Sequence, residues 1–273
     1  MCLIFVSHDP EGPWPLVVAA NRDEFFARPA LAADFWTSDP GILGGRDLKE
    51  GGGWLALRRD GRFACVTNYR DPQLHKDGRK SRGAIVANLL RSKDSLSSLL
   101  SALRAERREY NAFNLLAGEG DALWFYGSED DDLRKLTPGL YGLSNASLDT
   151  PWPKVEHGKA EMALALQAAS VGQGGPLESN RLALRSALLT LLSNEQRAAD
   201  SELPGTGIPL EAERALSARF IRLPGYGTRA STTVIKGDGR LEFFERSFDA
   251  DGKISDERRH ELQSSATAFR PGR

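Results

Sequence analysis

Residues 1–25 read MCLIFVSHDPEGPWPLVVAANRDEF, and this stretch contains the clearest indication of the fold. An apolar run at 2–7 is followed by a turn segment rich in proline and glycine at 8–15 and by a second apolar run at 16–20. Two such runs joined by a short turn segment predict an antiparallel hairpin. The second run leads directly into the polar residues 21–24, so the hairpin carries charged and amide groups at the end of its second strand.

Strand and helix patterns alternate along the rest of the chain. The expected strands are short apolar runs bounded by turn residues: 54–58 and 62–67 around Asp60-Gly61, 112–117 and 122–126, 141–143, 219–223, 232–236 and 241–246. The expected helices show apolar residues at helical spacing: 85–89, 96–103, 155–169 and 177–192. The polar segments after residue 24 and at 194–216 are interpreted as loops. This order predicts one α+β domain at 1–249, with helices on the faces of antiparallel sheets. The polar residues 250–273 are expected to form a partly frayed tail.

Composition excludes several classes of protein. The 36 Lys and Arg residues nearly balance the 37 Asp and Glu residues, which argues against a nucleic-acid-binding protein that works through a basic face. No apolar run approaches the ~18 residues of a membrane helix, and the first residues lack the basic region of a secretory signal. Two cysteines are too few for a disulfide scaffold. We therefore expect a reducing compartment, the cytoplasm.

Cys2 is the most suggestive single residue. Removal of Met1 would leave an α-amino group, with a reference pKa of about 7.7–8.0, on a residue that carries a thiol. That amine could act as general base for its own side chain, as in hydrolases with an N-terminal Thr, Ser or Cys. The alternative is that Cys2 is a small hydrophobic residue of an apolar strand, as we expect for Cys65.

The polar segment Asn21-Arg22-Asp23-Glu24 places an amide, a guanidinium and two carboxylates at a strand end, where side chains alternate between faces. Arg22 could stabilise a thiolate or an anionic substrate, and Asp23 could orient an amine or an amide. The alternative is a solvated turn with local ion pairs, which contribute little. Neither the cysteines nor the four histidines show the spacing of zinc ligands, so no metal site is expected.

Five segments together resemble the NRDE family, which includes transport and Golgi organisation protein 2. They occur in order along nearly the whole chain: MCLIF (1–5), AANRDEFFARP (19–29), GGGWLAL (51–57), TNYRDP (67–72) and PGYGTR (224–229). Members of this family look related to N-terminal nucleophile hydrolases. The resemblance implies a four-layer αββα sandwich of antiparallel sheets.

The choloylglycine hydrolase and penicillin V acylase branch of these hydrolases suggests roles for the first site residues. That branch uses a cysteine directly after the initiator methionine, which matches Cys2, and an aspartate shortly after the second strand, which matches Asp23. It also has an arginine three residues before the aspartate. Here that position is Ala20, and the arginine is Arg22 instead.

The same resemblance implies further site residues from more distant parts of the chain. Two asparagines that serve the oxyanion hole and the nucleophile match Asn68 and Asn145 by their sequence context. A late arginine is also implied, and both Arg219 and Arg229 fit its place.

Three functional hypotheses follow. The first is a hydrolase or acyltransferase that attacks an amide or thioester with Cys2 and requires no cofactor. The second is a carrier of haem, acyl-CoA or lipid, in which 21–24, with Asn21 and Glu24, line a binding cleft. The third is an interaction module without small-molecule chemistry. The basic run KDGRKSR at 76–82 is either a solvated loop or a contact for an anionic ligand.

Overall fold

The computed structural model describes residues 2–171 and 177–263, and its strands form two sheets. Sheet A has the order β10 (Gly139–Leu143), β1 (Cys2–His8), β2 (Leu16–Phe25), β12 (Tyr226–Gly237), β13 (Arg240–Phe248) and β14 (Ile254–Gln263), with β11 (Arg222–Leu223) paired to β12. Sheet B has the order β3 (Ala30–Trp36), β4 (Asp39–Asp47), β5 (Leu55–Arg58), β6 (Phe63–Asn68), β7 (Phe113–Glu119), β8 (Ala122–Gly127) and β9 (Asp132–Leu136). Each strand runs antiparallel to its neighbours.

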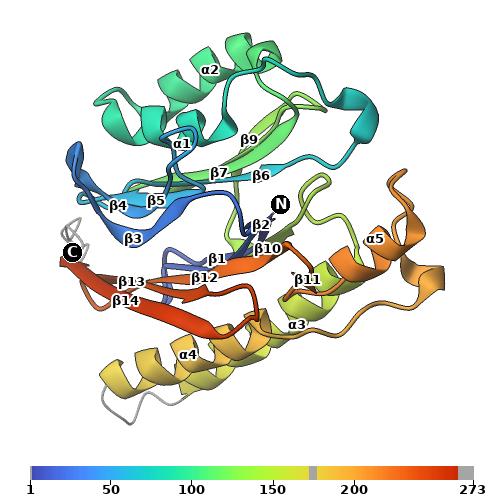
Figure 1. The fold of residues 1–273 in the computed structure, drawn as a ribbon. Coiled ribbons are helices and arrows are strands. Elements are labelled where there is room, and N and C mark those ends of the chain that lie inside the picture. The colour runs from blue at the N-terminus through green and yellow to red at the C-terminus, as the bar shows by residue number, and fades with distance from the viewer. Residues whose placement is uncertain (1, 172–176, 264–273) are drawn as a thin grey trace.

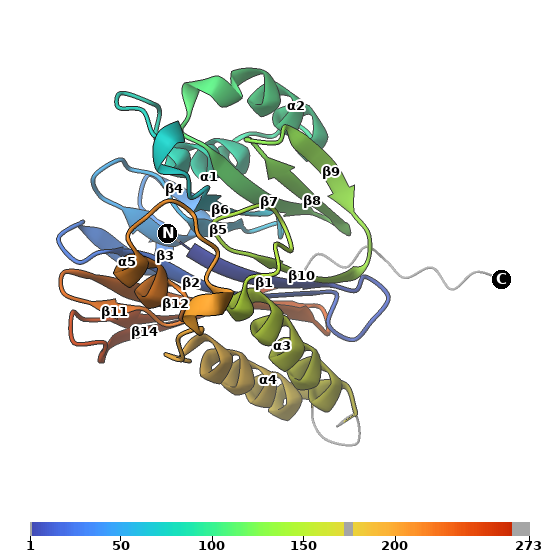
Figure 2. The same cartoon turned by 90° about the vertical axis from the view of Figure 1, so that its right-hand side faces the viewer.

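The helices cover the outer faces of the two sheets. α1 (Arg82–Arg91) and α2 (Leu96–Glu106) lie on sheet B, whereas α3 (Pro153–Val171) and α4 (Leu177–Leu192) lie on sheet A (Figure 1). The view turned by 90° shows the same order of layers, with α5 (Leu210–Leu216) near the edge of sheet A (Figure 2). The α+β class and the αββα sandwich are therefore confirmed.

Strand β1 shows why the sequence of sheet A reads as continuous apolar runs. Ile4 and Val6 pack between the two sheets, and Leu3 and Phe5 pack against the helices on the other face. Because both faces are covered, residues 3–8 are all buried. A strand buried on both faces loses the alternation of polar and apolar residues.

Three strands lie where the sequence indicated a loop or a tail. β3 and β4 occupy part of the segment after residue 24, where glycines and irregular register conceal the strand pattern. β14 covers 254–263, within the tail expected to fray, and pairs with β13 from Arg240↔Gln263 to Phe248↔Ile254. Its side chains are mostly charged and exposed because it is the last strand of sheet A. Residues 264–273 of the expected tail lie outside the described residues.

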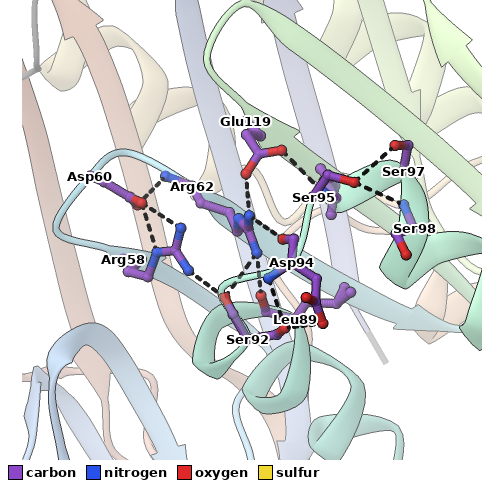
Figure 3. Close-up of polar contacts among 11 residues, drawn as sticks. Arg58, Asp60, Arg62, Leu89, Ser92, Asp94, Ser95, Ser97, Ser98 and Glu119 are labelled. Carbon is purple, nitrogen blue, oxygen red and sulfur yellow. Dashed lines mark hydrogen bonds and ion pairs between the residues drawn. The ribbon is translucent and has the colours of Figure 1, made fainter.

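A network around Arg62 attaches α1 to sheet B (Figure 3). The buried Arg62 guanidinium donates to the carbonyl oxygens of Leu89 and Ser92 at 3.1 Å and of Asp94 at 2.7 Å, and it pairs with Glu119. The carbonyls at the end of a helix have no partners within the helix, so these bonds satisfy groups that would otherwise be left unpaired. The network fixes the position of α1 relative to sheet B.

Candidate active site

The pairing of β1 with β2 determines which side chains face one another. Cys2 lies opposite Arg22, and Leu3 lies opposite Asn21. Directly opposed residues of an antiparallel pair share a face of the sheet. Cys2 and Arg22 therefore point toward sheet B, on the same side as Ala20, since residues two apart also share a face. Arg22 is thus on the same face as position 20, where the resemblance stated above implies an arginine.

A cleft of about 230 Å³ opens where these strand ends meet sheet B and the start of α1. It brings together five of the residues that the sequence singled out: Cys2, Arg22, Asp23, Glu24 and Asn68. Its other walls include Arg28, Asp47, Trp54 and residues 79–83. Strands and a helix from distant parts of the sequence therefore converge on one thiol.

The environment of Cys2 contains opposing charges. Burial raises the pKa of the Cys2 thiol, and the carboxylates of Asp23 and Glu24 raise it further, whereas the Arg22 guanidinium lowers it. Cys65 is completely buried between the sheets, and burial raises its pKa far above the usual range. Of the two thiols, Cys2 alone lines the cleft.

Arg22 is held rigidly. Its guanidinium donates to Asp47 at 3.1 Å and stacks 4.2 Å above the centroid of the Trp54 ring. Asp47 also accepts two bonds from Arg28, at 2.5 and 3.1 Å. Burial alone would raise the pKa of Asp47, but the bonds from Arg28 and from the Glu50 backbone keep it below its usual value. The acceptor of Arg22 therefore stays ionised, and Arg22 stays at the cleft.

Asp23 is positioned from strand β12. The Thr228 hydroxyl donates to the Asp23 carboxylate at 2.7 Å and accepts a bond from the Ile221 backbone N–H at 2.9 Å. Burial raises the pKa of Asp23, and the charges of Lys154 and Arg70 oppose that rise. In the PGYGTR segment, Thr228 thus contacts the site through Asp23.

The two asparagines have different surroundings. Asn68 lines the cleft, and its side-chain amide makes no hydrogen bond to any residue in the part of the chain that the structure describes. Asn145 is buried outside the cleft, and its amide donates to the Asn68 backbone oxygen at 2.9 Å. Asn68 is therefore available to a ligand, while Asn145 holds the backbone of Asn68.

Asn21 lies on the helix-facing side of sheet A and does not line the cleft. Its amide donates to the backbone oxygens of Leu192 at 2.9 Å and Arg219 at 2.8 Å. Its carbonyl oxygen accepts a bond from the Ser231 hydroxyl at 2.6 Å. The first two contacts join sheet A to the end of α4 and to the segment before β11, and the third links β2 to β12 within the sheet.

Neither candidate for the late arginine lines the cleft. Arg219 forms a two-bond pair with Glu161, at 2.7 and 2.8 Å. Arg229 donates to the backbone oxygen of Phe25 at 3.2 Å and lies where the register between β2 and β12 shifts. Arg229 therefore has no partner in the register, which passes from the Thr228↔Asp23 pair to the Ala230↔Arg22 pair.

Arg82 is a cleft residue that sequence reasoning missed as an individual site residue. It is the first residue of α1, and its one hydrogen bond to a described residue is a long contact of 3.4 Å to the Ala112 backbone oxygen. Burial lowers the pKa of Arg82, and the Cys2 charge opposes that effect. A Cβ on Gly52 would lie 2.3 Å from the Gly83 carbonyl carbon, so the glycines before Trp54 allow α1 to approach. The sequence signal that could have located Arg82 is Ser81, a typical N-cap residue directly before the apolar helical pattern of α1.

Two kinds of feature are absent from residues 2–171 and 177–263. No three His, Cys, Asp or Glu residues in those ranges gather closely enough to hold a metal ion. No helix in those ranges is both long and apolar enough to cross a membrane.

Comparison with known sequences gives a match over nearly the whole chain. The family model for Transport and Golgi organisation 2 matches residues 1–250. The Transport and Golgi organization protein 2 homologs of Bos taurus and Homo sapiens are 40% and 39% identical, each over 90% of this chain and 93% of the relative. The Drosophila melanogaster protein is 29% identical over 90% of this chain and 92% of its own length.

Two solved structures resemble this chain at low sequence identity. A mutant C2A conjugated bile acid hydrolase from Clostridium perfringens has a TM-score of 0.47 and 8% identity, over 96% of this chain and 92% of the other. The Caenorhabditis elegans ortholog of N-acylethanolamine-hydrolyzing acid amidase has a TM-score of 0.45 and 9% identity, over 86% and 92% of the two chains.

Proposed function

Starting from a chain that belongs to the Transport and Golgi organisation 2 family, we propose a cytoplasmic acyl-transfer enzyme. Cys2 is its nucleophile, and an amide or a thioester of a small molecule is its substrate. The observation that carries this proposal is the cleft in which the thiol of Cys2 meets Asp23, Asn68 and the guanidinium groups of Arg22 and Arg82. A nucleophile, an orienting carboxylate and donors for a developing anion are the parts that acyl transfer requires.

Before any reaction, maturation removes Met1 and exposes the α-amine of Cys2. Cys2 pairs with Arg22. Asp23, the residue that follows Arg22 in β2, therefore supports this end of β1. The amine takes the thiol proton while the sulfur attacks the carbonyl carbon, and the C–N or C–S bond then breaks as the proton passes to the leaving group. Water attacks the resulting thioester, the amine takes one of its protons, and the acid leaves as the thiol is restored.

Asn68 and Arg82 stabilise charge in this reaction. The free Asn68 amide supplies a donor for the oxyanion, a contribution of roughly 3–4 kcal/mol where such donors have been removed. Arg82 supplies a cation that no carboxylate within the described residues neutralises at salt-bridge distance. A cation beside a thiol favours its ionised form. We therefore expect Arg82→Gln to slow alkylation of Cys2 by about tenfold at pH 7, equivalent to one pKa unit. Arg91→Gln, at the other end of α1, serves as the matched control.

The test combines intact mass with single-turnover kinetics. The intact mass of the purified protein is measured first, to establish whether Met1 is absent. The protein is then mixed with a panel of acyl p-nitroanilides and acyl thioesters. We expect a burst of product equal to the protein concentration and an acyl adduct on Cys2. Cys2→Ala should lose both signals, and Cys65→Ala should keep them. If Cys2→Ala gives the same burst and adduct as the wild type, Cys2 is not the nucleophile.

The same cleft also defines the alternative, a carrier of haem, acyl-CoA or lipid. At about 230 Å³, the cleft lies below the roughly 300–1,000 Å³ of pockets that enclose drug-sized ligands, which favours a small acyl group over a bulky cargo. His8, the histidine nearest to Cys2 in the sequence, lies at the opposite end of β1 and does not line the cleft. A saturable Soret shift at micromolar haem that disappears in Cys2→Ala, together with no acyl adduct in the wild type, would favour the carrier.

A further inference from the structure

A second cavity lies at the start of α3. It measures about 370 Å³, within the roughly 300–1,000 Å³ range of small-molecule pockets, and is larger than the Cys2 cleft. The first turn of α3, the segment 194–199 and Ser217–Arg219 enclose it. No residue lines both this cavity and the Cys2 cleft, so it is a separate site.

The charge on the cavity wall is mainly positive. Lys154, Arg197 and Arg219 line it, against one carboxylate, that of Glu202. Arg219 is already paired with Glu161. Arg197 is exposed and makes no hydrogen bond or ion pair with any residue in 2–171 or 177–263. Arg197 can therefore bind a ligand without giving up a partner within the protein.

Lys154 is the buried member of this group, with 5% of its surface exposed. Its ammonium donates to the neutral backbone oxygen of Leu216 at 2.8 Å, and no carboxylate of the described residues lies within 4.0 Å of it. An ammonium has three N–H donors, so two remain for other acceptors. Burial lowers the pKa of Lys154 to about 8, with Arg70 acting in the same direction and the charges of Asp23 and Glu213 opposing it.

A buried cation that lacks a close anion is costly, and the cost falls when an anion binds beside it. We propose that this cavity is a binding site for a small organic anion, which Lys154 holds from the inside and Arg197 holds from the rim. The ligand carries a compact group of anionic oxygens, a phosphate or clustered carboxylates. The neutral Asn194, Gln196 and Ser217 side chains also line the cavity, together with the imidazole of His157, and fit a polar body.

Titration calorimetry on the full chain tests this proposal, with inorganic phosphate and citrate as separate probes. We expect at least one probe to bind saturably below about 10 mM. Arg197→Ala should weaken that binding at least fivefold, and Lys154→Met should abolish it. Glu202→Gln should tighten it two- to threefold by removing the one acidic group on the wall. The arm with the higher affinity identifies the phosphate or the carboxylate class.

Two control variants locate the binding. Lys93→Ala removes an exposed charge between α1 and α2, and Arg79→Ala removes a cation from the Cys2 cleft; both should bind the probe as the wild type does. Absence of saturable binding with both probes overturns the proposal, as does unchanged affinity in Arg197→Ala or loss of binding in Arg79→Ala. If Lys154→Met does not fold, Arg197→Ala and Glu202→Gln decide the question, because both positions lie near the surface.

Discussion

Asn21 offers the sharpest test of whether the polar segment at 21–24 serves the fold or the ligand. Its side chain is 1% exposed and makes three hydrogen bonds, to the Leu192 and Arg219 backbone oxygens and from the Ser231 hydroxyl. Asn21→Ala leaves these three groups without their partner. A buried polar group that loses its partner costs about 1–3 kcal/mol, so we expect the free energy of unfolding to fall by about 4 kcal/mol.

Urea unfolding followed by tryptophan fluorescence measures this loss. Asn88→Ala, at an exposed position of α1, is the matched control and should change stability by less than about 0.5 kcal/mol. Asn21→Asp should be at least as damaging as Asn21→Ala, because a carboxylate would face two carbonyl oxygens. A loss below about 1 kcal/mol in Asn21→Ala would refute the reasoning. Folded protein that keeps wild-type alkylation of Cys2 would support a structural role for Asn21.

Three further predictions concern thiols, buried charge and pH. Iodoacetamide should modify Cys2 in the folded protein, at a rate that rises at alkaline pH because burial raises the pKa of the Cys2 thiol. Cys65 should react only after unfolding. Peptide mass mapping distinguishes the two modified cysteines. Arg62→Met should lower the free energy of unfolding in urea by about 3 kcal/mol, because it leaves buried carbonyl oxygens unpaired. Arg58→Met, at a more exposed position, should lower it by less than about 1 kcal/mol. Equal losses in the two variants would contradict the role of the network. Burial raises the pKa of Glu245 to about 7, so the folded state favours the protonated form and stability should fall as pH rises from about 4.5 through 7. Glu245→Gln should flatten this dependence, and an unchanged slope in thermal melts would count against it.

The sequence predicted the parts of the fold that depend on local pattern. The hairpin at 2–20 and the helix Leu177–Leu192 could be predicted because their apolar spacing is regular over their whole length. β3 and β4 could not be predicted, because glycines and register shifts interrupt the alternation of polar and apolar residues. These strands depend instead on contacts with neighbouring strands of the sheet. β14 could not, because an edge strand with charged side chains has the composition of a solvated tail.

The candidate site shows a similar division. Cys2, Asp23 and Asn68 could be named from the sequence because the family resemblance ties each to a motif, and the structure brings them to one cleft. Arg82 could not, because its charged neighbours read as a solvated loop and its contact with the cleft depends on where α1 begins. Neither Arg219 nor Arg229, the two candidates for the late arginine, lines the cleft, and no local pattern in PGYGTR reveals the bulge at Arg229.

The charged strand β14 also bears on how this chain behaves at high concentration. It covers the edge of β13 and is itself an edge strand of sheet A, where backbone N–H and C=O groups could pair with a strand from another molecule. Pairing of a second molecule with β14 is unfavourable, because it would desolvate charged side chains without matching partners. These side chains are Asp256, Glu257, Arg258, Arg259 and Glu261. Removing the charges of Asp256, Glu257, Arg258 and Glu261 would therefore trade solubility for self-association, whereas removing that of Arg259 would also take a partner from the buried Glu242.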